Sequence, residues 1–142
     1  MLDEIKVILG GLPFPDADFI AHLREKGREW NAAPLPHGVQ RGVPKMCFAN
    51  ATHAFLERGD LDYCEGVGFV PDIPSIAFLH AWCVDADGNV VDPTWDRPET
   101  CRYYGVRFPR RAYARHLAQT EFYGVYGGRN KSARKVLEKG GL

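Results

Sequence analysis

The sequence predicts a single α+β domain over residues 1–142, in which a cysteine-bearing helix packs on an antiparallel β-sheet that carries His and Asp. Apolar residues recur at helical spacing before about residue 60 and alternate with small or polar residues after it. Helices followed by a run of short strands are typical of α+β proteins. The chain can bury a core of its own, and 45% apolar and 12% aromatic residues fit a folded domain.

Two helices are predicted in the first part of the chain. The first covers 16–30, where apolar spacing is partly helical and an aspartate can cap the start. Residues 31–43, rich in Pro and Gly, form a loop. The second helix runs from Pro44, a residue suited to the first helical position, to Arg58, and Gly59 ends it. The apolar face that we expect in the core consists of Phe48, Ala51 and Phe55.

Strands follow from residue 61. Residues 61–69 alternate in polarity, which predicts a strand, and Pro71 and Pro74 interrupt the pattern. A β-hairpin is then predicted, with arms at 75–85 and 89–95. Beyond it we expect a strand, a helix and a short terminal helix, at 103–108, 109–119 and 131–139.

The hairpin turn determines which side chains meet. Residues 86–88 fit a three-residue loop that ends in a glycine at positive φ. Trp82 then faces Asp92, and Asp92 shares a sheet face with His80. The two become diagonal neighbours, about 7 to 8 Å apart between backbones. A two-residue loop would instead pair Cys83 with Asp92 and place His80 on the opposite face.

Cys47 completes a candidate catalytic set. The thiolate is the nucleophilic form of cysteine, and the first turn of a helix favours it. His80 would stabilise the sulfur anion as imidazolium and later protonate a leaving group, while Asp92 would orient the ring. The oxyanion would be held by the backbone N–H of Cys47, with Gln40 as a candidate second donor.

Each of these residues also has a purely structural interpretation. Cysteine is often a small buried hydrophobe, so Cys47 can be a core residue. His80 can be a core histidine that a backbone group satisfies, and Asp92 can simply turn a strand into a loop. Their joint occurrence favours the catalytic hypothesis.

Further candidates for substrate binding are weaker. Asn50, one helical turn after Cys47, either contributes to the site or bonds to a neighbouring loop. Glu65 either lines the pocket or is a half-exposed carboxylate of the sheet. In the predicted register Trp82 and Trp95 point to opposite faces, so one fills the core and the other walls a cleft. The remaining cysteines, interpreted as structural thiols, are Cys64, Cys83 and Cys101.

Three segments carry a family resemblance. CFANA at 47–51, HAW at 80–82 and DPT at 92–94 resemble the core of the transglutaminase-like branch of the papain-like cysteine enzymes. The resemblance covers about residues 40–96, and the His-x-Trp and Asp-x-Thr signatures match residue for residue. Many members carry a Trp beside the nucleophile, where this chain has Met46.

The resemblance implies a papain-like or transglutaminase-like fold, with Cys47 as nucleophile, His80 as base and Asp92 as orienting acid. It implies acyl transfer at an amide, ester or thioester of a protein or small molecule, with transglutamination and deamidation as related reactions. Hydrolysis is preferred, because nothing in the sequence marks a second acceptor site. No cofactor is expected. YCEG at 63–66 is similar to small uncharacterised proteins of phages and bacteria.

Location and partners are less constrained. No run of about 18 apolar residues and no signal-peptide pattern is present, so we expect no membrane partner and a cytoplasmic location, in a host cell if the protein is phage-encoded. The oligomeric state stays open. A third hypothesis, a zinc site of Cys and His, has little support, because no Cys-x-x-Cys pair occurs.

Charge is unevenly distributed although it sums to zero. Residues 1–96 hold 7 Lys or Arg against 15 Asp or Glu, and residues 97–142 hold 11 against 3. The basic part either packs on or solvates an acidic face, or contacts an acidic partner or nucleic acid. Scattered arginines without a nucleic-acid motif favour the first interpretation. The alternative function is therefore a non-catalytic protein-binding module, such as a phage-encoded inhibitor, that binds through the basic C-terminal region.

Overall fold

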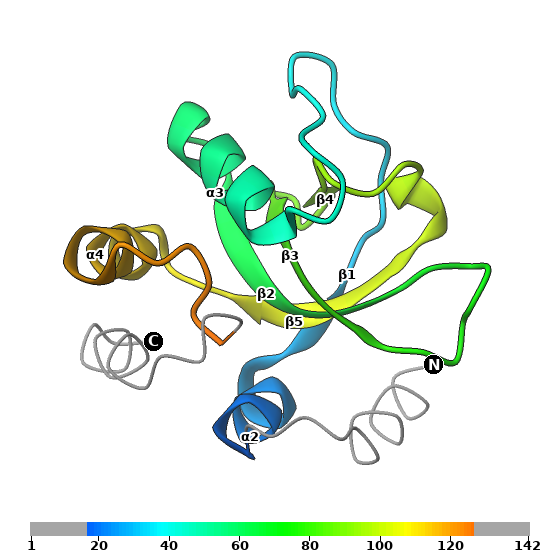
Figure 1. The fold of residues 1–142 in the computed structure, drawn as a ribbon, viewed down its shortest axis with the longest axis horizontal. Coiled ribbons are helices and arrows are strands. Elements are labelled where there is room, and N and C mark those ends of the chain that lie inside the picture. The colour runs from blue at the N-terminus through cyan, green and yellow to red at the C-terminus, as the bar shows by residue number, and fades with distance from the viewer. Residues whose placement is uncertain (1–16, 127–142) are drawn as a thin grey trace.

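The computed structural model describes residues 17–126, where three helices pack against a curled antiparallel sheet (Figure 1). The strands are β1 (Arg28–Trp30), β2 (Asp62–Phe69), β3 (Phe78–Val84), β4 (Val90–Val91) and β5 (Arg102–Arg107), in the order β1-β5-β2-β3-β4. The helices are α2 (Ala17–Lys26), α3 (Cys47–Glu57) and α4 (Arg110–Thr120), with a short 3-10 helix at Pro98–Thr100. The α+β fold class is thus confirmed.

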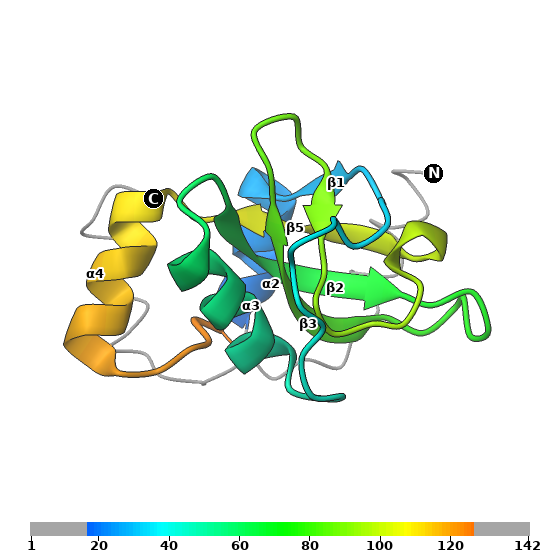
Figure 2. The same ribbon diagram turned by 90° about the horizontal axis from the view of Figure 1, so that it is seen from above.

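The sheet curls until its two edges meet. Asn31, directly after β1, forms a bridge with Asn89, directly before β4. The backbone N–H of Val90 donates to the Asn31 carbonyl at 2.8 Å. Figures 1 and 2 accordingly show β1 and β4 side by side, although they lie at opposite ends of the strand order.

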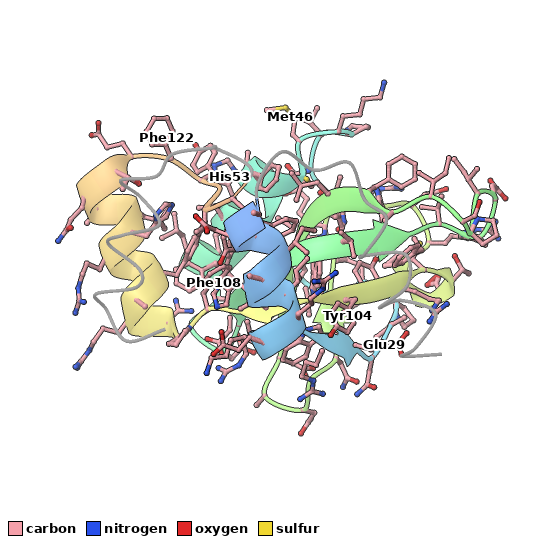
Figure 3. All side chains as sticks on the ribbon, turned by 90° about the horizontal axis from the view of Figure 1, so that it is seen from below. Glu29, Met46, His53, Tyr104, Phe108 and Phe122 are labelled. Carbon is pink, nitrogen blue, oxygen red and sulfur yellow. The ribbon has the colours of Figure 1, made fainter. Side chains whose placement is uncertain are left out.

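This curvature creates a core on each side of the sheet. Residues of α2, α3 and α4 cover one face, where Leu23, Phe55 and Tyr113 are fully buried. Figure 3 shows Tyr104 of β5 and Phe108, the residue that follows β5, beside α2. The second core, on the other face, consists of Trp30, Cys64, Trp82, Val84, Val90, Cys101 and Tyr103.

Strand β2 is buried on both faces because it lies between these cores. Only Asp62 at its beginning is partly exposed. The alternation of residues 61–69 therefore marked large and small side chains rather than a buried and a solvent face, and a strand in that position was the correct prediction.

The predicted hairpin register is confirmed. Val84 faces Val90, and the N–H of Asp85 donates to the Asn89 carbonyl at 3.0 Å. Gly88 has a φ of 81° and its N–H donates to the Asp85 carbonyl at 3.1 Å, which closes the three-residue loop. The two-residue alternative is excluded, since Cys83 pairs with Val91.

Two helix boundaries differ from the prediction. The first helix ends at Lys26, and Trp30 lies on β1, where its indole N–H donates to the Gly105 carbonyl at 3.0 Å. Residues 28–30 gain strand pairing with β5, and the Trp30 indole becomes buried. These contacts outweigh the helical spacing of the apolar residues, from which a helix end at residue 30 was predicted. The second helix begins at Cys47 rather than Pro44, because Lys45 adopts a left-handed φ of 69°.

Of the three remaining predicted elements, two are confirmed and the structure does not describe the third. The strand at 103–108 and the helix at 109–119 correspond to β5 and α4. The short helix predicted at 131–139 lies outside the described residues. Within residues 17–126, no helix has the length and apolar character needed to cross a membrane.

Candidate active site

Cys47 is the first residue of α3, and its side chain is partly exposed. The preceding residues form a turn in which the N–H of Met46 donates to the Val43 carbonyl at 3.3 Å. Helical bonding begins with the N–H of Asn50, which donates to the Met46 carbonyl at 2.9 Å. Cys47 therefore lies at the end of the helix where backbone N–H groups lack intrahelical acceptors and the dipole favours an anion.

His80 and Asp92 form a hydrogen-bonded pair. His80 Nε2 lies 2.9 Å from Asp92 Oδ2, and both side chains are buried. Trp95 stacks on the imidazole, with ring centroids 3.8 Å apart and an interplanar angle of 11°. The bond to Asp92 occupies one ring nitrogen and the indole fixes the ring plane, so that Nδ1 is left for a further partner.

Asp92 is held by one donor from its own loop and one from β5. Its Oδ1 accepts from the backbone N–H of Thr94 at 2.9 Å, in the loop after β4. Its Oδ2 also accepts from the Tyr103 hydroxyl of β5 at 2.7 Å. Tyr103 was not predicted as a site residue, because no motif surrounds it and its partner depends on the register between strands that are distant in sequence.

Asn50 joins the two halves of the site. Its Nδ2 donates to the Thr94 hydroxyl at 2.9 Å and to the Val43 carbonyl at 2.8 Å. Gly42 packs so closely here that a Cβ would lie 2.1 Å from Asn50 Oδ1. Of the two roles considered for Asn50, bonding to a neighbouring loop is confirmed, and this bonding links the start of α3 to the residues that follow Asp92.

The surroundings change the pKa of both members of the pair. Burial lowers the pKa of His80, but the charge of Asp92, their hydrogen bond, and the hydrogen bond and charge of Cys47 raise it, to about 9. Burial raises the pKa of Asp92, yet His80 and the donors Tyr103 and Thr94 bring it below its ordinary value. His80 is therefore imidazolium and Asp92 carboxylate at neutral pH.

Cys47 and His80 open into one pocket of about 300 Å³. Its lining consists of Lys45, Cys47, Val70, Phe78, Leu79, His80, Thr94 and Trp95. The other three thiols are buried away from it, and burial raises the pKa of each. All four cysteines are free, and Cys47 is the partly exposed one.

Two candidate binding residues are placed elsewhere. Gln40 is exposed and lines a separate hollow of about 160 Å³ together with His53 and Glu57 of α3. Glu65 is fully buried, so both predictions made for it, a pocket wall and a half-exposed carboxylate, are wrong. It accepts hydrogen bonds from the Tyr63 hydroxyl at 2.9 Å and from two backbone N–H groups of residues 125–126. The physical reason is the helix-covered core: Glu65 lies on the same face of β2 as Tyr63, and residues 125–126 close over it there.

The tryptophan prediction was wrong about the faces, but its expectation of one core residue and one cleft residue is confirmed. Trp82 and Trp95 both contact the rings of His80 and Tyr103 rather than lying on opposite faces. Strand β4 ends at Val91, so strand alternation does not extend to Trp95. Trp82 is fully buried behind His80, whereas Trp95 walls the pocket.

Comparison with known protein families, with curated proteins and with solved structures gives no match. Among residues 17–126, no group of three or more His, Cys, Asp or Glu side chains is arranged to hold a metal ion.

Proposed function

We propose that this protein is a cysteine-dependent acyl-transfer enzyme of the transglutaminase-like branch of the papain-like superfamily, with hydrolysis as its reaction. The observation that carries the proposal is the 2.9 Å contact between His80 Nε2 and Asp92, beside a pocket that Cys47 also lines. The arrangement of a helix that begins at a cysteine and an antiparallel sheet that bears His and Asp supports it.

In the acylation step, the Cys47 sulfur attacks the carbonyl carbon of an amide, ester or thioester and forms a C–S bond. The proton that the attack requires the thiol to give up is held by His80, because a pKa of about 9 favours the protonated imidazole at neutral pH. His80 passes this proton to the leaving amine, alcohol or thiol as the scissile bond breaks. The product is a thioester on Cys47.

In the second step, water is the acceptor. Neutral His80 takes a proton from water, the resulting hydroxide attacks the thioester carbon, and the C–S bond breaks. The acid departs, and Cys47 and His80 return to their starting charges. Throughout both steps Asp92, held by Tyr103 and Thr94, keeps the ring in one orientation.

The oxyanion of each tetrahedral intermediate needs donors. In this proposal the backbone N–H of Cys47, at the unpaired start of α3, supplies one of them. Gln40 was the candidate for the second, but it lines a different hollow.

The alternative, a binding module that acts through the basic C-terminal region, has weaker support. Several of its arginines contact the chain itself: Arg102 bonds to Glu29 and Arg107 to Asp62. Arg110 of α4 donates to the Leu61 carbonyl at 2.6 Å and lies over a phenylalanine ring of α3. These contacts favour the interpretation in which basic residues pack on their own domain.

An acyl-trapping experiment tests the proposed function. Incubation with 4-nitrophenyl acetate, followed by acid quenching and intact mass spectrometry, should give one acetyl group, located on Cys47 by peptide mapping. His80→Gln should lower the acylation rate at least tenfold, while Cys101→Ala, the matched removal of a thiol outside the pocket, should leave it unchanged.

Two results would count against catalysis. Acylation that is absent at Cys47 in the folded wild type, or equally fast in His80→Gln, contradicts the proposed function. The binding alternative gains if Cys47→Ala retains biological activity and charge reversal at the exposed Arg111 abolishes it. Arg110 is unsuitable for that test, because its contacts with α3 support the fold.

A further inference from the structure

The candidate pocket is unevenly lined. Four of its side chains are apolar, namely Val70, Phe78, Leu79 and Trp95. Apart from His80, the charged side chain in the lining is that of Lys45, which is exposed to solvent. A volume of about 300 Å³ is at the small end for ligand pockets and has room for a single side chain or short acyl group.

The position of Lys45 is set by its backbone. Its φ of 69° is a left-handed conformation that side chains other than Gly, Asn and Asp seldom adopt, and it costs energy. The residues before Lys45 are held at two points: Asn50 Nδ2 donates to the Val43 carbonyl at 2.8 Å, and the N–H of Gly42 donates to the Pro93 carbonyl at 2.8 Å. Lys45 is thus positioned by the same contacts that connect α3 to the loop after Asp92.

The charge of Lys45 is not offset nearby. Among residues 17–126, the ion pairs join other cations, such as Arg41 with Asp96, and no carboxylate lies within ion-pairing distance of the Lys45 amine. An amine beside an apolar pocket can pair with an anionic group of a bound molecule. Because the Lys45 amine is exposed to water, its charge destabilises the protein little when the pocket is empty.

We propose that Lys45 is a specificity-determining residue, and that the substrate has an apolar acyl group that carries a carboxylate. The apolar wall takes the hydrocarbon part while the carboxylate pairs with the Lys45 amine, two residues before the nucleophile. This assignment rests on the proposed acyl-transfer function and extends it to a substrate class.

A matched pair of esters tests the assignment. The mono-4-nitrophenyl ester of succinic acid and 4-nitrophenyl butyrate have acyl chains of equal length, and only the first carries a terminal carboxylate. Acylation rates of Cys47 are measured at low ionic strength by mass spectrometry. We expect the succinyl ester to react roughly fivefold faster, the effect of an exposed ion pair, and 0.5 M salt to reduce the preference.

Variants separate charge from shape. Lys45→Met should remove the preference, so that the succinyl and butyryl esters acylate Cys47 at rates within twofold of each other. Lys45→Asn, a neutral residue that tolerates left-handed φ, gives the same comparison if Met disturbs the turn. Lys26→Met removes a cation that lines a different pocket and should leave the preference intact.

Each outcome is decisive. A preference that depends on Lys45 supports the assignment. Acylation of Cys47 without a preference, or with a preference that survives both Lys45 variants, overturns the assignment but leaves the proposed function standing. Failure of both esters to acylate Cys47 overturns the proposed function and the substrate class with it.

Discussion

Tyr103 donates a hydrogen bond of 2.7 Å to Asp92 Oδ2, the same carboxylate oxygen that lies 2.9 Å from His80 Nε2. Tyr103 is thus a fourth polar member of the site, beside Cys47, His80 and Asp92. It lies on β5, which is separated in the sheet by β2 from β3, the strand that bears His80. Because a hydroxyl that donates to a carboxylate favours the ionised form, Tyr103 helps keep the pKa of Asp92 below its ordinary value.

Removal of this hydroxyl should destabilise the protein more than an ordinary hydrogen bond would. Tyr103→Phe keeps the ring and loses a bond to a charged group, which costs about 1.5–3 kcal/mol of unfolding free energy. Tyr104→Phe, the matched control, loses a bond to the Gly27 carbonyl and should cost about 0.5–1.5 kcal/mol. Chemical denaturation measures both. Equal losses would show that the Asp92 contact has no special strength.

The pH dependence of stability should carry the signature of His80. Its pKa is raised from 6.5 to about 9 in the folded state, so its contribution is complete below about pH 6.5 and is lost as pH rises through 9. A shift of this size corresponds to about 3 kcal/mol. The difference in unfolding free energy between wild type and His80→Gln should fall by that order between pH 6 and pH 9.5. A difference that is constant over this range contradicts the charged pair.

Asn50 should couple the nucleophile to the hairpin. Asn50→Ala removes the bonds to Val43 and Thr94 and leaves the buried Thr94 hydroxyl without this donor, at a cost of about 1–3 kcal/mol. It should also slow alkylation of Cys47, because the start of α3 is no longer fixed. His53→Ala, on the exposed side of the same helix, is the control and should change neither quantity. A stability loss without any change in alkylation would limit Asn50 to a purely structural role.

Glu65 should act as an anchor for residues 125–126. Glu65→Ala leaves three buried donors unsatisfied and should cost about 3 kcal/mol or more, while Glu65→Gln keeps an acceptor and loses less. Exchange of the Val125 and Tyr126 amides should accelerate in both variants. Glu57→Ala, an exposed carboxylate of α3, should stay within about 0.5 kcal/mol of wild type. Unchanged amide exchange would refute the anchor.

The His80 and Asp92 contact could be predicted because it is local. The turn residues around Gly88 determine the loop length, the loop length sets the register, and the register brings the two side chains to one face. The helix that begins with Cys47 was predicted within three residues, and its start was displaced by the left-handed φ of Lys45, which no propensity foresees.

What could not be predicted depends on contacts between distant segments. Tyr103 meets Asp92 because β5 pairs with β2 and the sheet curls, neither of which a sequence pattern specifies. Glu65 is buried because residues 125–126, about 60 positions further along the chain, close over its face of β2. Trp95 reaches His80 only because the chain leaves the sheet after β4.

The proposed mechanism requires that His80 activates Cys47. The most direct test is the rate of Cys47 alkylation by iodoacetamide as a function of pH, in wild type and His80→Gln, with Cys47→Ala to exclude labelling of the buried thiols. Comparison with the other cysteines would not suffice, because their burial alone makes them slow.

Imidazolium favours the thiolate only while it holds its proton, which His80 loses near pH 9. We therefore expect wild type to react at least tenfold faster than His80→Gln at pH 6.5, and the two rates to converge above pH 9. Equal rates for the two proteins at every pH would show that His80 does not activate Cys47.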